Sequence, residues 1–322
     1  MIDTNFYNKQ DTNQSPTHKK IMDKRNMMGL EETLIENYKF TTRSAVKDVK
    51  VRRILLTGHK GFIGSHVYDF IMNKTVWRLQ SGFELDCIDL KDGDDIADFK
   101  EGHPWWEKKY DVVIHLAAFA ALRDSIQNPN KFWENNVAKT NNIFEYCKKT
   151  NRDGYKCKLI YASSAGVYEW WQNPYAITKA VNEVQAPPPP FAIGLRFFNV
   201  WAEEGSREDM LFRMLQDNTA KYITRHRRDY IHVSDVATAI MVCIEHPHVH
   251  PSVIDVGTSQ DIAVMEIAEA FGRDLPIKEN EDLPGEPLCL RAYPDWLVEL
   301  GWEPKINIRD HLEILKKNNA KS

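Results

Sequence analysis

The 322-residue sequence contains few cysteines, and the five that it has are far apart along the chain. Such a sparse, odd-numbered set forms neither a disulfide framework nor a zinc-binding pattern, and it is typical of proteins in a reducing compartment. The alternating histidines His246, His248 and His250 lack a carboxylate or thiolate at a recognisable spacing, so we interpret them as a loop. We therefore expect a cytoplasmic protein without a metal site.

Long apolar runs and an excess of charge of one sign are also missing. No stretch approaches the roughly 18–20 apolar residues that cross a bilayer, and the N-terminus has no hydrophobic stretch of the secretory type. With 42 Lys and Arg residues against 46 Asp and Glu residues, the formal net charge is only -4. This balance gives no electrostatic reason to expect nucleic acid or an anionic membrane as a partner.

The first 50 residues differ in composition from the rest of the chain. Up to Met28 they are rich in Asn, Gln, Thr, Asp and Lys, which predicts a partly disordered polar extension over residues 1–50. Within it, residues 29–40 place Leu30, Leu34 and Ile35 at helical spacing, so we expect one short amphipathic helix there.

From Val51 onward, short apolar and β-branched runs alternate with segments of helical periodicity such as 65–74 and 131–149. The runs that we interpret as strands are 54–58, 83–90, 111–118, 157–164, 191–198 and 252–257. This alternation predicts an α/β fold with a Rossmann-type, doubly wound parallel sheet. We place this domain at residues 51–200, with a returning strand near 252–257.

After Phe198 the pattern loosens into shorter pieces. An amphipathic run covers residues 261–272, and a final helix is expected near 310–316. We assign residues 201–322 mainly to a smaller C-terminal substrate-binding lobe.

A glycine triplet with a spacing of three opens the alternating pattern. Gly58 follows a predicted strand and allows a tight turn, Gly61 lets backbone amides approach a pyrophosphate, and Gly64 lets helix and strand pack closely. The helix that begins here offers free N–H groups and a positive dipole end to phosphates. In this context the triplet predicts a dinucleotide site.

Asp89 stands at the end of the second predicted strand. A carboxylate there accepts hydrogen bonds from both ribose hydroxyls and repels a 2′-phosphate, which favours NAD over NADP. His59 and Lys60 in the glycine turn weigh the other way, because cations there can meet a 2′-phosphate. Asp95 and Ile96 follow and are candidates to flank the adenine.

Tyr175 and Lys179 form a second motif. A spacing of four on a helix puts phenol and ammonium on one face, and a nearby cation is expected to lower the pKa of the tyrosine toward neutrality. Upstream, a predicted strand ends at Ser163 and Ser164, the edge at which a parallel sheet presents groups to a ligand. Ser164, Tyr175 and Lys179 suit proton transfer on an alcohol or ketone while a hydride moves to or from nicotinamide.

Residues 52 to about 316 resemble an extended short-chain dehydrogenase/reductase of the NAD-dependent epimerase/dehydratase family, whose members include UDP-glucose 4-epimerase. The order and spacing of the motifs carry the resemblance more than any one motif does. These motifs are TGHKGFIGSHV, IDL, HLAA, ASSAGVY, PYAITK, LRFFNV, RDYIHVSDVA and ELGWEP.

The resemblance implies roles for individual residues. Ser164 resembles the hydroxyl that bonds the sugar oxygen, Tyr175 the catalytic base, and Lys179 the residue that binds the nicotinamide ribose. Asn199 and Ser163 resemble substrate contacts, and Arg228 the arginine that binds the nucleotide diphosphate, a role that suits a guanidinium. The implied cofactor-binding residues are Gly58, Gly61, Phe62, Ile63, Gly64, Asp89, Leu90, Asp95, Ile96, Leu116, Ala117, Ala118, Asn136, Tyr175 and Lys179.

The sequence departs from the family pattern around the sugar pocket. Glu169 replaces a glycine, and the usual FNVYGP motif here continues from Val200 as Trp201, Ala202 and Glu203. The segment between Tyr168 and Tyr175 is also short. The resemblance therefore does not identify the sugar of the substrate.

The leading function is an NAD-dependent epimerase of a UDP- or GDP-linked sugar, which oxidises a hydroxyl to a transient ketone and returns the hydride to the opposite face. A homodimer is expected from the resemblance. Two alternatives stay open: an NADPH-dependent nucleotide-sugar reductase resembling GDP-fucose synthase, and a non-catalytic dinucleotide- or sugar-nucleotide-binding protein. Ala165 and Gly166 stand where a 4,6-dehydratase usually has an Asp-Glu pair, which argues against that reaction.

Overall fold

The computed structural model describes residues 51–75, 82–246, 251–278 and 287–319. By Cα proximity the chain divides into two units, Met1–Phe40 and Thr41–Ser322, and the description below concerns the second. The N-terminal extension with its expected helix, His248 and His250 all lie outside the described residues.

Six parallel strands form the main sheet, in the order β2-β1-β3-β4-β5-β9. They are β1 (Arg53–Thr57), β2 (Glu84–Ile88), β3 (Val112–His115), β4 (Lys158–Ser164), β5 (Ala192–Phe197) and β9 (Val253–Val256). All six predicted strands and the predicted fold class are confirmed. The strand order reverses between β1 and β3, which is where open α/β sheets bind ligands beyond the carboxyl ends of the strands.

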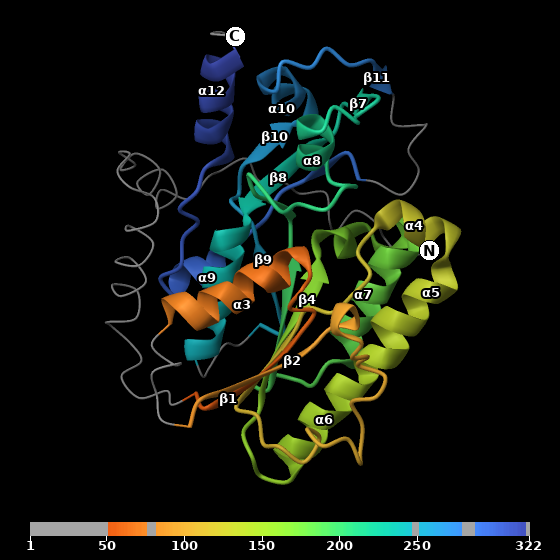
Figure 1. Ribbon diagram of the computed structural model, residues 1–322, viewed down its shortest axis with the longest axis vertical. Coiled ribbons are helices and arrows are strands. Elements are labelled where there is room, and N and C mark those ends of the chain that lie inside the picture. The colour runs from red at the N-terminus through yellow and green to blue at the C-terminus, as the bar shows by residue number, and fades with distance from the viewer. Residues whose placement is uncertain (1–50, 76–81, 247–250, 279–286, 320–322) are drawn as a thin grey trace, which may run out of the picture. The chain divides into compact units, whose positions relative to one another are not determined.

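Helices cover both faces of this sheet. Figure 1 shows α3 (Phe62–Lys74) and α9 (Val233–Glu245) on one face, and α6 (Thr140–Arg152) and α7 (Pro174–Gln185) on the other. Because helices cover both faces, the inner strands contain apolar runs; Leu55 in β1, for example, is fully buried.

The helix predicted over residues 131–149 is present, but it is not uniform. It begins as α5 (Pro129–Trp133), passes through a π-helical turn at η4 (Glu134–Lys139) and continues as α6. Before it lies the short helix α4 (Leu122–Gln127).

A smaller sheet is built around β8 (Arg227–His232), which pairs with three strands. These are β6 (Asn199–Trp201) and β12 (Cys289–Leu290), both parallel, and β10 (Asp261–Ala263), which is antiparallel. Its apolar core includes Trp201, Phe212 and Leu312.

Short helices and strands surround this sheet. The helices are α8 (Leu211–Gln216), α10 (Val264–Ala270), α11 (Asp295–Glu299) and α12 (Ile308–Asn319), and two further strands, β7 (Ile223–Thr224) and β11 (Ile277–Lys278), pair with each other. The final helix is confirmed. The amphipathic run over 261–272 divides between two elements, because residues 261–263 pair with β8 and the helix α10 begins at Val264.

Within the described residues, no helix is long and apolar enough to cross a bilayer. No group of three or more His, Cys, Asp or Glu side chains in the same residues is arranged to hold a metal ion.

Candidate active site

The glycine turn after β1 is packed backbone against backbone. Gly58 has a φ of 77°, and a Cβ on it would lie 2.6 Å from the backbone nitrogen of Ala117, in the loop after β3. A Cβ on Gly64 would lie 1.9 Å from the carbonyl oxygen of Gly58. Gly61 precedes the first residue of α3, so the free N–H groups of that helix open at the turn. This arrangement fits a dinucleotide pyrophosphate at the reversal of strand order.

The ends of β1 and β3 are joined by polar side chains. The buried His115 contacts Thr57 Oγ1 through Nδ1 at 2.7 Å and Thr140 Oγ1 through Nε2 at 3.0 Å. Burial, and next the charge of Lys179, lower the pKa of His115 to about 3, so the ring is neutral at cellular pH. The backbone N–H of Ala117 donates to Thr57 Oγ1 at 3.3 Å, and this fixes the loop that faces Gly58.

Asp89 follows β2 and lies close to the glycine turn. Its Oδ2 accepts a hydrogen bond from the backbone N–H of Lys60 at 2.8 Å, and its Oδ1 accepts one from Lys91 at 2.9 Å. A carboxylate has about four acceptor positions, so about two remain for ribose hydroxyls. The expected ribose role of Asp89 is compatible with this geometry.

The residues expected to flank the adenine have different surroundings. Asp95 pairs with Lys139 at 2.6 Å; burial works against its charged form, but the hydrogen bonds from Lys139 and the backbone of Ala97 lower its pKa overall. Ile96 lies in the hydrophobic core, whereas Leu90 is exposed. Their contacts with a cofactor stay predictions.

Local capping positions α7 (Pro174–Gln185), the helix that carries Tyr175 and Lys179. A 3-10 segment, η5 (Ala165–Gln172), separates β4 from α7. Asn173 then caps α7 by accepting the N–H of Ala176 at 2.8 Å, and Pro174 occupies the first turn. Ser125 of α4 accepts the N–H of Tyr175 at 3.2 Å. Two neighbouring elements therefore fix the start of the helix that carries Tyr175.

Ser164, Tyr175 and Lys179 come together as predicted. The ammonium of Lys179 lies 5.9 Å from the centre of the Tyr175 ring, and Ser164 lies close enough to Tyr175 to act on its pKa. Lys179 is buried and donates to the carbonyl oxygen of Ala162 at 2.8 Å. The chain therefore holds a phenol, a hydroxyl and an ammonium at the carboxyl end of β4.

The pKa values differ from the sequence-based expectation. Burial raises the pKa of Tyr175, while its hydrogen bond to Ser164 and the charge of Arg207 act in the lowering direction. Burial also lowers the pKa of Lys179 to about 8, with the charge of Glu183 opposing this. Lys179 therefore does not lower the pKa of Tyr175 toward 7 in this structure, because the removal of water from both groups has the larger effect.

Glu183 is a functional candidate that sequence reasoning missed. It accepts two hydrogen bonds from Arg196, at 2.9 and 2.7 Å, and a third from the hydroxyl of Ser163 at 2.5 Å. The Ser163 hydroxyl is thus bound to Glu183, so its expected substrate contact stays a prediction. The spacing of four between Lys179 and Glu183 was the available signal, since it places both on one helix face.

Asn136 lies fully buried in the π-helical turn. Its side chain donates to the carbonyl oxygen of Phe119 at 2.9 Å and accepts the N–H of Phe119 at 2.9 Å. It also donates to Thr178 Oγ1 at 3.2 Å. Asn136 therefore connects the loop after β3 to α7, and its expected direct contact with the cofactor stays a prediction. Such single π turns are frequent at functional sites.

Asn199 and Arg228, which are expected to bind the substrate, lie on the smaller sheet. Asn199 begins β6, and Arg228 lies on β8, where its Nη1 donates to the carbonyl oxygen of Leu288 at 3.1 Å. Burial raises the pKa of Glu169 in η5, and the positive charge of Arg228 counteracts part of this effect. Arg228 therefore acts electrostatically on the segment that follows Ser164.

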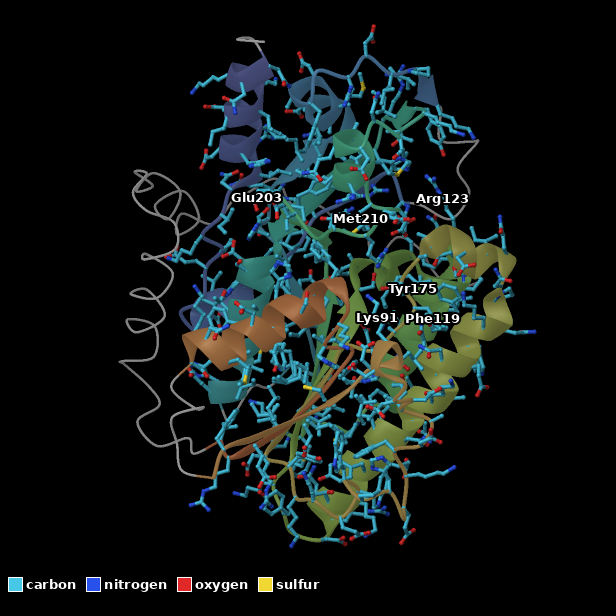
Figure 2. The ribbon with its side chains drawn as sticks, in the orientation of Figure 1. Lys91, Phe119, Arg123, Tyr175, Glu203 and Met210 are labelled. Atoms are coloured by element: carbon cyan, nitrogen blue, oxygen red, sulfur yellow. The ribbon has the colours of Figure 1, made fainter. Side chains whose placement is uncertain are left out.

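The segment after β6 contributes further residues that the sequence did not reveal. Arg207 donates to the carbonyl oxygen of Ala120 at 3.4 Å, and its charge acts on Tyr175. Glu203 accepts from His232 Nε2 at 3.0 Å. Figure 2 shows Tyr175 together with Phe119 and Lys91, with Glu203 and Met210 on the side of the smaller sheet. The position of this segment depends on tertiary packing, so no local pattern indicated it.

Comparison with known proteins identifies the family. Residues 54–257 match the model of the NAD dependent epimerase/dehydratase family. The chain belongs to this family. The sequence is 30% identical to UDP-glucose 4-epimerase 3 of Oryza sativa subsp. japonica, over 80% of this chain and 87% of that protein. The resemblance stated from the motifs is therefore confirmed, as is NAD as the cofactor of the family.

Solved structures share the fold. One is UDP-glucose 4-epimerase from Bifidobacterium longum in complex with NAD+ and UDP, with a TM-score of 0.65, 23% identity and coverage of 84% of this chain and 98% of that one. Another is RMD from Pseudomonas aeruginosa complexed with NADPH, with a TM-score of 0.63, 21% identity and coverage of 83% and 98%. The same fold therefore occurs with either dinucleotide.

Proposed function

We propose that this member of the family is an NAD-dependent epimerase of a nucleotide-linked sugar. The observation that carries the proposal is the grouping of Ser164 at the end of β4 with Tyr175 and Lys179 on one face of α7, beyond the strands whose glycine turn fits a dinucleotide. The names of relatives such as the rice UDP-glucose 4-epimerase support an epimerase and do not favour the reductase alternative.

In the proposed reaction, Tyr175 removes the proton from a sugar hydroxyl and later returns it. Ser164 bonds the same oxygen and keeps it within reach of the phenol, because it ends the strand β4 against which the helix of Tyr175 packs. Lys179 holds a positive charge beside the site and has further N–H groups, besides the one given to Ala162, for the ribose of the cofactor.

Bound NAD supplies the hydride acceptor and donor, so the sugar is oxidised to a ketone and reduced again without net consumption of an oxidant. Burial raises the pKa of Tyr175, which works against the phenolate form. Tyr175 would ionise more readily with NAD+ bound, since a nearby positive charge lowers the pKa of a phenol. Arg228 binds the diphosphate, and Asn199 contacts the sugar.

A panel of UDP- and GDP-linked sugars tests the proposal. Purified protein with its NAD is incubated with each sugar, and the products are separated and identified by NMR. We expect one new epimer with no net accumulation of NADH. Stoichiometric oxidation of NADPH would instead indicate a reductase, and bound NAD without turnover on any sugar would indicate a binding protein.

Tyr175→Phe links the reaction to the residue. We expect turnover to fall by about 10²–10⁴-fold, the usual contribution of a general acid–base, while NAD binding changes by less than about threefold. Tyr161→Phe is the matched control, because its hydroxyl is buried and has no hydrogen-bond partner among the described residues. It should remain fully active. An active Tyr175→Phe protein would contradict the proposed mechanism.

A further inference from the structure

Several basic side chains gather at the corner where Asp89 meets the glycine turn. His59 and Lys60 come from the turn itself, and Lys91 follows Asp89 on η3 (Leu90–Asp92). A 2′-phosphate on the adenosine ribose would lie in this corner, where ammonium groups are well suited to bind it. The basic residues alone would therefore favour NADP.

A second carboxylate, that of Asp92, holds two of these groups. Lys60 Nζ forms an ion pair with Asp92 Oδ1, and His59 Nε2 lies 3.1 Å from Asp92 Oδ2. The side chain of Lys91 also points toward the glycine turn, since its Nζ donates to the carbonyl oxygen of Lys60 at 2.9 Å. The pairing with Asp92 is also the main cause that raises the pKa of Lys60.

The backbone fixes Asp92 in this position. Its N–H donates to the carbonyl oxygen of Asp89 at 2.9 Å, and Gly93, with a φ of 89°, ends the short 3-10 turn. Asp89 already accepts a backbone N–H on each of its oxygens, and its remaining acceptor positions are those expected to meet the ribose hydroxyls. The two carboxylates thus have separate tasks: Asp89 faces the ribose, and Asp92 pairs with cations of the glycine turn.

We propose that Asp92 is a specificity-determining residue that makes this NAD site reject a 2′-phosphate. With Asp92 present, the positive charges of Lys60 and Lys91 are balanced by the two carboxylates. Without Asp92, one positive charge is in excess, and Lys60 is free to bind phosphate oxygens. The inference rests on the dinucleotide site of the proposed function, but not on the identity of the sugar or on turnover.

Competition between NAD+ and NADP+ tests this directly. Wild-type protein and Asp92→Asn are incubated with equal concentrations of both dinucleotides, and the bound species are read by native mass spectrometry. We expect wild type to hold NAD+, and the NADP+ to NAD+ ratio to rise about tenfold in Asp92→Asn because a lysine–phosphate contact is charge-assisted. Occupancy by NAD+ reports that the variant is folded, and Asp92→Ser should shift the ratio in the same direction.

Two further variants show whether the shift comes from the released lysine. Asp92→Asn combined with Lys60→Met should return the ratio to within about threefold of wild type. Asp94→Asn is the matched control, since it removes the same charge from an exposed neighbour; it should leave the ratio unchanged. Raising the salt concentration to about 0.5 M should reduce the gain.

An unchanged ratio in Asp92→Asn would overturn the proposal. So would an equal shift in Asp94→Asn, because the effect would then be a general change of charge and not the loss of one pairing. Neither result depends on epimerase activity, so failure of this inference and failure of the proposed function are separately visible.

Discussion

Gly64→Ala is the sharpest test of the cofactor turn. The added Cβ would lie 1.9 Å from the carbonyl oxygen of Gly58 and 2.8 Å from its carbonyl carbon. These are backbone atoms, so no side chain can rotate away, and the turn and the start of α3 have to separate. The proposed pyrophosphate site uses the same atoms, so we expect stability and NAD affinity to fall together.

The magnitude follows from two opposing effects. Alanine favours a helix over glycine by about 1 kcal/mol, whereas overpacking typically costs about 1–3 kcal/mol, with backbone clashes at the upper end. We expect a net loss of about 2 kcal/mol, which lowers Tm by about 4–8 °C in a domain of this size. NAD affinity should fall by about tenfold or more, since a displacement of the turn moves the amides that face the phosphates.

Two other glycines give a graded control, measured by thermal unfolding and by calorimetric titration with NAD+. A Cβ on Gly61 would lie 3.1 Å from the carbonyl oxygen of Gly58, and one on Gly166 would meet nothing closer than 3.5 Å. Gly61→Ala should therefore cost about 1 kcal/mol, and Gly166→Ala should stay within about 0.5 kcal/mol of wild type. If Gly64→Ala binds NAD and unfolds like Gly166→Ala, the close approach of the backbones does not matter and the reasoning is refuted.

Two further predictions concern side chains that hold loops. The hydrogen bond from His232 is the main cause that lowers the pKa of Glu203 to about 2, so its stabilising effect should be fully present above pH 4.5 and lost as the pH falls toward 2. Chemical denaturation should show the difference in unfolding free energy between wild type and Glu203→Gln shrinking over that range, and a constant difference would contradict this. Asn136→Ala removes the partner of both backbone groups of Phe119, so we expect a loss of about 1–3 kcal/mol in the unfolding free energy. The matched Asn151→Ala removes the partner of both backbone groups of Cys157 before β4 and should not alter NAD affinity, whereas Asn136→Ala should weaken it.

The sequence was most informative where one residue type alone satisfies the geometry. Glycines at 58 and 64 are required because backbone atoms lie where a Cβ would be, and this requirement is visible as a fixed spacing after an apolar run. The strands of the main sheet were equally visible, because burial on both faces leaves apolar runs. The ends of the strands were not visible in the sequence. The apolar run of β3, for example, continues through Leu116 to Ala118 into a loop that packs on the glycine turn.

Features that depend on long-range contacts escaped prediction. Arg207 acts on Tyr175 across a sequence separation of about thirty residues, and Asp92 looks like any surface carboxylate until Lys60 is seen beside it. The pKa of Tyr175 was expected to be low from its spacing to Lys179 alone. Burial reversed the direction, and burial of an individual side chain cannot be read from a motif.

The buried ammonium of Lys179 has a consequence for how this site has to be made. Taking that charge out of water is unfavourable, as the lowered pKa shows, and the bond to Ala162 offsets only part of it. The penalty is incurred when the chain folds, before any ligand arrives, so a dinucleotide meets a cation that is already dehydrated and fixed. Burial of Lys179 therefore lowers the stability of the fold at this site, and the packing of the surrounding sheet and helices compensates for it.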